Sequence, residues 1–220
     1  KIKFLLKEIN PDILINTAAF TNVDEAEFNK EEAFKINYFG PLELSKICRD
    51  MNVILIHIST DYVFDGGKKL PYKPNDKTNP LSVYAKSKLA GEKAIVDSNC
   101  KYLILRTSWL FSKHGNNFLK KIISKALKEE TLNVVNYEYS NPTYGYDLGE
   151  AIIEVAFKLK DDKFLRKIIH FTGSETLSRF EFASRILKSA KELNMIGKTV
   201  SINPIGVDQV EPDARWKGPV

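Results

Sequence analysis

The chain has 220 residues, enough for one domain with a sizeable core or for one domain and a smaller lobe. Its 33 basic and 28 acidic side chains are interspersed, so the net charge of +5 does not support a nucleic-acid partner. No apolar run approaches the roughly 20 residues that span a bilayer, and we expect no membrane partner. Cys48 and Cys100 show neither a disulfide framework nor a zinc-ligand spacing, so we predict no metal site and a reducing cytoplasm.

Strands and helices alternate along the first part of the chain. Residues 1–9 are amphipathic and end before Pro11, and residues 12–20 form the apolar run of a strand covered on both faces. A loop and one long helix are expected over 21–52, a strand over 53–60, a loop rich in Gly and Pro, a helix within 79–95, and a strand over 100–111. Further elements are expected as a helix over 114–130, a strand over 131–139, a helix within 141–159, a strand over 167–173, a helix over 176–194 and a strand over 199–205.

The order of the first elements is strand, helix, strand, helix, strand, which predicts a parallel sheet with crossover helices and the α/β fold class. In such sheets, ligands bind beyond the carboxyl ends of the strands. The predicted strand ends carry small or polar residues and a tryptophan: Ala18 and Ala19, Thr60, and Ser108 followed by Trp109. We therefore expect these ends to meet the start of the 79–95 helix at one crevice.

Tyr84 and Lys88 have the spacing YxxxK within the 79–95 helix. Positions i and i+4 share one helix face, so the phenol and the ammonium should project together. A nearby cation favours the ionised phenol, whose reference pKa is about 10, and so would allow proton exchange near neutral pH. The spacing alone favours an ordinary surface pair, and only the strand ends around it favour a catalytic pair.

Three further residues have a functional and a structural interpretation. Thr60 is either a hydroxyl donor to a substrate carbonyl or a cap for the loop that follows it. Trp109 is either a wall for a sugar or nicotinamide ring or a core tryptophan. Asn37, expected in mid-helix, is either hydrogen-bonded to something buried or simply exposed. His57, His114 and His170 have no second ligand at a metal spacing, so we assign them core or surface roles.

An ordered set of motifs gives a family resemblance. The run HISTDYVFDG (57–66) is followed by VYAKSKLAGE, LRTSWLF and GNNF, and then by PT and DL. Together with PDILINTAAFTNVDEAE and AFKINYFGPLELS upstream, this set resembles the dTDP-4-dehydrorhamnose reductase family, within the extended short-chain dehydrogenase/reductases. The motifs cover nearly the whole chain in the order of the family.

The resemblance implies an NADPH- or NADH-dependent reduction of the C4 keto group of dTDP-4-dehydro-6-deoxy-L-mannose to dTDP-L-rhamnose, in nucleotide-sugar and cell-surface polysaccharide biosynthesis. It implies a catalytic trio of Thr60, Tyr84 and Lys88. Asn37 would support the trio without touching the substrate itself. The cofactor would contact Ala18, Ala19, Thr21 and Ser59, as well as Tyr84 and Lys88. The nucleotide-sugar would contact Asp61, Tyr62, Trp109 and Asn117.

The same resemblance implies two parts, a Rossmann-like cofactor domain over 1–135 and a nucleotide-sugar lobe over 136–220, with 160–173 returning to the main sheet. The family's GxxGxxG turn would precede residue 1, so the choice between NAD and NADP cannot be inferred from these residues. If that segment is missing from the polypeptide, we expect weak dinucleotide binding. A homodimer is one candidate assembly. Two alternatives stay open: another nucleotide-sugar reductase, and a non-catalytic nucleotide-binding subunit similar to the regulatory β-subunit of methionine adenosyltransferase.

Overall fold

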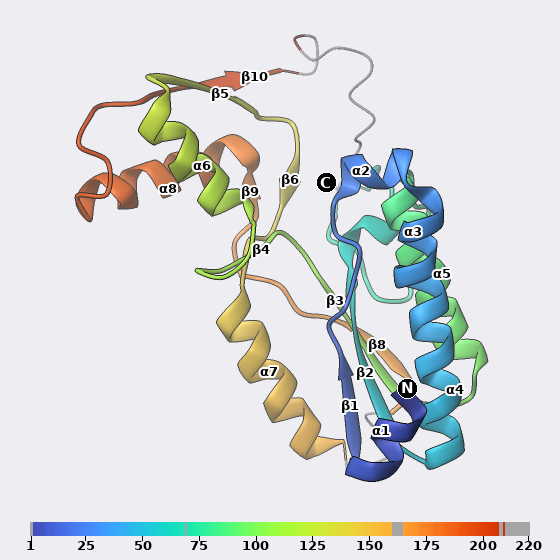
Figure 1. The fold of residues 1–220 in the computed structure, drawn as a ribbon. Helices are drawn as coiled ribbons and strands as arrows, with labels where there is room; N and C mark the ends of the chain where they lie inside the picture. The colour runs from blue at the N-terminus through green and yellow to red at the C-terminus, as the bar shows by residue number, and fades with distance from the viewer. Residues whose placement is uncertain (1, 69, 160–164, 207–208, 210–220) are drawn as a thin grey trace.

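The centre of the molecule is a parallel sheet of four strands (Figure 1). The computed structural model describes residues 2–68, 70–159, 165–206 and 209. The strand order is β1-β2-β3-β8, with bounds Ile13–Asn16, Ile54–Thr60, Lys101–Thr107 and Lys167–His170. All three pairings are parallel, which confirms the predicted α/β class. The strand expected over 12–20 ends at Asn16, because the chain turns away into a loop before α2.

Helices cover the sheet on both faces. Helices α4 (Gly40–Met51) and α5 (Val83–Asp97) lie on one face, and α7 (Gly145–Lys158) lies on the other (Figure 1). Side chains of a strand alternate between the faces, so Leu55 packs with Ile95 of α5 while Ile56 packs with Leu148 of α7. This burial on both sides explains why the strands read as continuous apolar runs.

Helical turns fill the connection between β1 and β2 more completely than expected. Asn22 caps the amino end of helix α2 (Val23–Phe28), because its side chain accepts from the backbone N–H of Glu25. Helix α3 (Lys30–Phe34) continues through a π-helical segment, Lys35–Phe39, into α4. A π-helical turn holds one residue more than an α-helical turn, and such turns are frequent at functional sites. Here the segment places Asn37, fully buried, against α5.

Gly91 of α5 is the point at which this helix touches the π-helical segment. A Cβ atom built on Gly91 would lie 2.1 Å from the backbone oxygen of Asn37. We expect Gly91→Ala to lower the free energy of unfolding by about 1–3 kcal/mol, because backbone must move to admit the methyl group. Gly149→Ala in α7 is the matched control, since nothing lies within 4 Å of its added Cβ. There alanine should stabilise by about 0.5–1 kcal/mol, and equal effects in chemical denaturation would contradict the packing described.

A smaller lobe stands beyond the carboxyl ends of the strands (Figure 1). It contains α6 (Phe118–Lys128), α8 (Arg179–Glu192) and a parallel pair of strands, β5 (Thr131–Val135) and β10 (Ser201–Ile205). Two short pairs connect it to the sheet: β4 (Leu110–Phe111) with β7 (Thr143–Tyr144), and β6 (Tyr139–Ser140) with β9 (Leu177–Ser178).

The expected boundary between cofactor domain and lobe, after residue 135, does not coincide with the way the elements pack. The apolar side of α6, including Ile122 and Ala126, packs against Phe182 and Ile186 of α8, so α6 and β5 are built into the lobe. The chain returns to the main sheet at β8, within the predicted 160–173 segment, of which residues 160–164 lie outside the described part.

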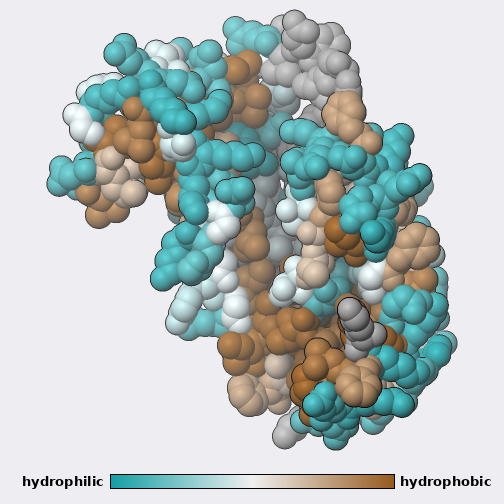
Figure 2. Space-filling view, viewed as in Figure 1, coloured by the Kyte–Doolittle hydropathy of each residue, from teal (hydrophilic) through white to brown (hydrophobic). Residues whose placement is uncertain are grey.

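The β1 edge of the sheet and the neighbouring helix α1 carry exposed apolar side chains. Strand β1 is the edge strand of the described sheet, and Ile15 is 44% exposed. Helix α1 (Ile2–Ile9) exposes Phe4 and Ile9 beside it, and Figure 2 shows apolar surface gathered there. No helix of the described residues has the length and apolar character needed to cross a bilayer.

Candidate active site

Thr60, Tyr84 and Lys88 come together where β2 ends and α5 begins. Thr60 is the last residue of β2, and Tyr84 and Lys88 lie on the first turns of α5. Ser82 starts this helix by accepting from the backbone N–H of Ala85 at 3.1 Å. All three side chains of the predicted trio are buried. The YxxxK pair is therefore not a surface pair.

The phenol of Tyr84 is held in a buried position. Its ring meets the ring of Tyr62 edge-on, with centroids 5.7 Å apart. Burial raises the pKa of Tyr84 to about 12, and hydrogen bonding with the Thr60 hydroxyl works against that rise. The YxxxK spacing predicts that Lys88 lowers the pKa of the phenol, but burial has the larger effect and raises it. Tyr84 is consequently protonated at neutral pH.

The ammonium of Lys88 points beneath the tyrosine, toward β2. Its Nζ donates to the carbonyl oxygen of Ile58 at 2.7 Å and lies 3.5 Å from Nε2 of His57. Lys88 is 2% exposed, and burial lowers its pKa to about 8 although Glu92 opposes the shift. Near neutral pH this lysine can therefore exist in both protonation states.

The hydroxyl of Thr60 is tied to Asp61. Thr60 Oγ1 accepts from the backbone N–H of Tyr62 and donates to Asp61 Oδ1, each at 3.2 Å. The other carboxyl oxygen of Asp61 accepts from Ser140 Oγ of the lobe at 3.0 Å. Asp61 thus connects Thr60 to β6. Burial raises its pKa to about 6, in spite of these hydrogen bonds and the positive charge of Arg179.

The raised pKa of Asp61 predicts a stabilising substitution. Between about pH 4 and 6 the folded state binds more protons than the unfolded state, so this residue lowers stability as pH rises through that range. We expect Asp61→Asn to raise the free energy of unfolding at pH 7 by about 1–3 kcal/mol, with no gain below about pH 4. Asp65→Asn should instead lower the free energy of unfolding at pH 7, because hydrogen bonds stabilise the Asp65 carboxylate and lower its pKa to about 2. Denaturation curves at pH 4 and 7 measure both, and an Asp61→Asn protein less stable at pH 7 would contradict the expectation.

Asn37 ties three segments together. Its Oδ1 accepts from the backbone N–H of Phe20 at 2.8 Å, and its Nδ2 donates to the Phe20 carbonyl at 3.0 Å and to Ser87 Oγ at 2.9 Å. Ser87 in turn donates to the carbonyl oxygen of Tyr84. The loop after β1 and the first turn of α5 are therefore fixed to each other through one buried amide.

Trp109 lies at the entrance to the lobe in an unusual backbone conformation. Its φ of 38° is in the left-handed region, which costs free energy for a bulky residue. One side of its ring packs on Phe182, with centroids 6.4 Å apart. The guanidinium of Arg179 stacks 3.8 Å from the ring centroid, and Arg179 Nε donates to Glu138. The wall predicted for a substrate ring therefore includes Arg179 as well as the indole.

Comparisons with known proteins agree with this geometry. The family described as RmlD substrate binding domain matches residues 1–215. A dTDP-4-dehydrorhamnose reductase from Sinorhizobium fredii is 37% identical over 96% of this chain and 71% of its own length. The chain belongs to the dTDP-4-dehydrorhamnose reductase family. A reductase of this name from Bacillus anthracis, solved in complex with NADP, superposes with a TM-score of 0.85 at 32% identity, over 96% of this chain and 73% of that one. A dTDP-4-keto-6-deoxy-D-glucose reductase from Streptomyces niveus is 37% identical over 69% of this chain and 53% of its own length.

The remaining predicted site residues of this reductase family member differ in their exposure and in their hydrogen bonds. Ala18 and Thr21 are exposed and Ala19 is half-buried in the loop after β1, while the Ser59 hydroxyl donates to Glu92. Asn117 caps α6, since its Oδ1 accepts from the backbone N–H of Lys120 and its Nδ2 donates to the carbonyl oxygens of Ser112 and His114. Its contact with substrate phosphates stays a prediction.

Several residues that shape the site were not identified from sequence. Arg179 and Glu138 lie more than 40 positions apart, and only the fold brings them to Trp109. Glu92 and Arg106 form a buried pair behind Ser59. The sequence signal for that pair was Arg106 alone, a charged residue within the apolar run of β3, where an unpaired charge would be costly.

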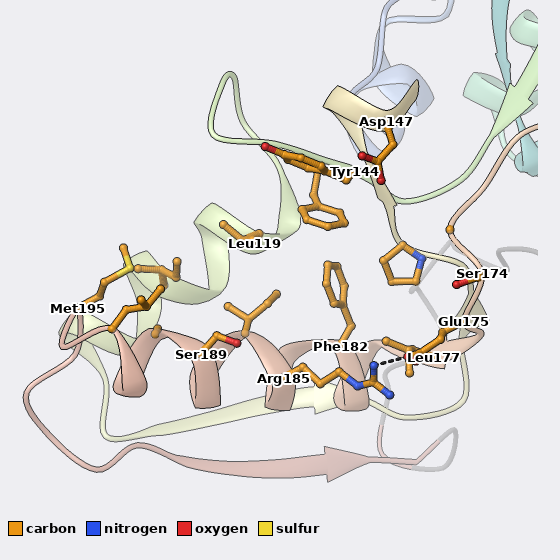
Figure 3. A pocket seen from close by; sticks show the side chains of 17 residues that line it. Leu119, Tyr144, Asp147, Ser174, Glu175, Leu177, Phe182, Arg185, Ser189 and Met195 are labelled. Atoms are coloured by element: carbon orange, nitrogen blue, oxygen red, sulfur yellow. Dashed lines mark hydrogen bonds and ion pairs between the residues drawn. The ribbon is translucent and has the colours of Figure 1, made fainter. Parts of the chain in front are cut away.

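The lobe also contains an apolar cavity of about 580 Å³ (Figure 3). Leu119 of α6 and Phe182 of α8 line it, and the ion pair between Arg185 and Glu175 lies at its edge. None of Thr60, Tyr84 and Lys88 lines this cavity. It lies against Phe182, on which Trp109 packs, so it is close to Trp109 but apart from Thr60, Tyr84 and Lys88.

Proposed function

We propose that this protein reduces the C4 keto group of dTDP-4-dehydro-6-deoxy-L-mannose with NADPH, and so forms dTDP-L-rhamnose. The observation that carries the proposal is the buried cluster of Thr60, Tyr84 and Lys88 at the carboxyl end of β2 in a chain of this reductase family. Such a cluster suits the addition of a hydride to a carbonyl, because a positioned proton donor and a second hydroxyl meet at one oxygen.

The residues present fit the nicotinamide end of the cofactor. The loop after β1 carries the small side chains of Ala18 and Ala19, which leave its backbone accessible at the carboxyl end of the sheet. Lys88 and Tyr84 lie on the neighbouring helix and supply the donors that would hold a ribose. A bound dihydronicotinamide would supply the hydride to the C4 carbon of the sugar.

Proton transfer falls to this chain's own side chains. Tyr84 would donate its proton to the C4 oxygen as the carbonyl bond becomes a hydroxyl. Thr60 would hydrogen-bond the same oxygen, which requires its proton to turn away from Asp61. Lys88 would support Tyr84 electrostatically. On the lobe side, Tyr62 and Trp109 would contact the sugar, and Asp61 would link lobe and hydroxyl. This assignment of roles rests on the hydrogen bonds around Thr60 and on the burial of Tyr84.

NADPH oxidation is the direct test. Turnover with dTDP-4-dehydro-6-deoxy-L-mannose should exceed turnover with its 3,5-epimer, dTDP-4-keto-6-deoxy-D-glucose, at equal concentration. A preference for the epimer would favour another nucleotide-sugar reductase. Saturable nucleotide binding without any turnover would favour a non-catalytic regulatory subunit and would reject the proposal.

We further propose action in the cytoplasm and assembly as a homodimer. Cys48 and Cys100 are buried free thiols, which agrees with a reducing compartment. Ile153 and Phe157 of α7 are 58% and 76% exposed and offer an apolar surface to a second copy. Light scattering on the purified protein and on Phe157→Glu tests the dimer, and a monomer at all concentrations would reject it.

A further inference from the structure

Trp109 has a strained backbone conformation that its surroundings must hold in place. A bulky residue with a φ of 38° carries a free-energy cost and persists only where the neighbouring structure fixes it. The backbone is fixed by hydrogen bonds to the segment around β7. The Trp109 carbonyl oxygen accepts from the N–H of Thr143 at 3.3 Å, and Ser108 Oγ donates to the carbonyl oxygen of Asn141 at 2.6 Å. The indole ring itself is half-buried, so its orientation depends on the side chains that touch it.

Arg179 connects the indole ring to the body of the lobe. Its guanidinium lies 3.8 Å from the centroid of the Trp109 ring and 5.0 Å from that of Phe118, the first residue of α6. Phe118 in turn stacks on Phe182 of α8, with ring centroids 5.6 Å apart. A guanidinium stacked on an aromatic face is attracted to it, most strongly by tryptophan and where water is excluded. The Arg179 side chain is 16% exposed, so this attraction is only weakly screened by water.

Glu138 fixes Arg179 at both its side chain and its backbone. Arg179 Nε donates to Glu138 Oε2 at 3.4 Å, and the backbone N–H of Arg179 donates to the Glu138 carbonyl oxygen at 3.1 Å. The Glu138 side chain is 13% exposed, and burial raises the pKa of its carboxyl group to about 7. The charge and the hydrogen bond of Arg179 oppose that rise. Arg179 therefore stabilises the ionised form of the group that holds it.

The first turn of α8 is an unfavourable place for an arginine. The helix begins with a capping box, in which Ser178 Oγ accepts from the N–H of Glu181 and Glu181 Oε2 accepts from the N–H of Ser178. The positive end of the helix dipole favours an acid in this turn, whereas Arg179 adds a second positive charge. A residue that opposes the local preference is expected where it serves a contact outside its own helix. For Arg179 that contact is the stack on Trp109.

We propose that Arg179 and Glu138 are positioning residues for Trp109. Glu138 holds the guanidinium of Arg179 in place, and the guanidinium holds the indole ring in the orientation in which it meets the sugar. This role rests on the proposed function, in which Trp109 contacts the sugar of the substrate. The ring is held in the same way before and during the reaction. The pair therefore contributes to binding of the nucleotide-sugar and not to the rate of the chemical step.

The order of the ring can be measured without cofactor or substrate. The indole band of the near-UV circular dichroism spectrum reports a tryptophan held in one orientation, and a Trp216→Phe background leaves Trp109 as the one tryptophan of the chain. At about pH 8, where Glu138 is mostly ionised, we expect Arg179→Lys and Glu138→Gln each to lose most of this band. Lysine keeps the charge but has no planar group to stack, and glutamine keeps the shape of the side chain but not its charge.

The matched control is Arg185→Lys. Arg185 lies on the same helix in an exposed pair with Glu175, so its replacement should leave the indole band unchanged. A band that survives in Arg179→Lys or in Glu138→Gln would overturn the proposal, and so would an equal loss in the control. If Arg179→Lys does not fold, as judged from the far-UV spectrum, Glu138→Gln still decides.

Steady-state kinetics tests what the held ring does for the substrate. We expect each of the two variants to raise KM for dTDP-4-dehydro-6-deoxy-L-mannose by about tenfold, with kcat and the KM for NADPH within a few-fold of wild type. The double variant should be no worse than either single variant, because Glu138 acts through Arg179. An unchanged KM, a fall in kcat in place of the rise in KM, or a double variant whose effect is the product of the single effects would overturn the proposal. Absent turnover by the wild-type protein would reject the proposed function, and the indole band would still decide whether Arg179 and Glu138 hold the ring.

Discussion

Replacing Tyr84 by phenylalanine is expected to lower kcat for NADPH-dependent reduction by about 10³-fold. A positioned general acid contributes roughly 10²–10⁴-fold, and phenylalanine removes the proton while keeping the ring. The edge-on contact with Tyr62 and the burial in α5 should survive, so stability should change little. Stopped-flow or steady-state absorbance at the dihydronicotinamide band measures the loss, and NADPH affinity by fluorescence titration should stay within a few-fold.

The matched control is Tyr102→Phe. Tyr102 lies in β3 within the core cluster that contains Cys100 and Ile104, away from Thr60 and Tyr84. This control removes a buried phenol hydroxyl of the same kind, so it should leave kcat unchanged. Full activity in Tyr84→Phe would show that another group donates the proton. An equal loss in both variants would attribute the effect to the removal of any buried hydroxyl.

The meeting of Thr60, Tyr84 and Lys88 could be expected from the sequence, whereas their catalytic roles come from the family resemblance and stay a prediction. Tyr84 and Lys88 are one helical turn apart, and Thr60 ends an apolar strand that a parallel sheet must bring to the same edge. No longer-range packing is needed to place these three. The fold class followed in the same way, because the alternation of apolar runs and amphipathic segments admits few topologies.

The electrostatics of the site could not be predicted in this way. The pKa of Tyr84 is raised rather than lowered because Tyr62 and residues of α2 and α3 bury the phenol, and the YxxxK spacing contains none of these. The contact between Asp61 and Ser140 joins positions 79 apart. The contacts of His57 could not be predicted either, since its neighbours Asn16 and Lys88 come from two other elements.

The boundary between domain and lobe shows a second limit. Helix α6 has an amphipathic pattern that fits either partner, a sheet face or another helix. Only the positions of Phe182 and Ile186 on α8 decide that it packs in the lobe. Amphipathic periodicity identifies the buried side of a helix but not the surface that covers it.

Replacing Arg106 by leucine is expected to cause the largest loss of stability among the changes considered, about 3–5 kcal/mol. Arg106 forms a two-pronged pair with Glu92, with Nε–Oε1 of 2.9 Å and Nη2–Oε2 of 2.6 Å, and both side chains are less than 5% exposed. Leucine would leave the Glu92 carboxylate buried without its cation. Arg106 also donates to the carbonyl oxygen of Pro74 and stacks over Phe64, so the loop after Asp61 should loosen as well. Chemical denaturation measures the first effect and limited proteolysis of the loop the second.

Two comparisons separate the buried charge from simple loss of packing. Lys158→Ala breaks an exposed pair with Glu154 and should change stability by less than about 0.5 kcal/mol. Adding Glu92→Leu to Arg106→Leu removes both charges and should recover much of the loss, because an apolar pair can occupy the same volume. A double variant no more stable than Arg106→Leu would assign the stability to the pair's shape. The hydrogen bond from Arg106 to the Pro74 carbonyl, which both variants lack, would then account for part of the lost stability.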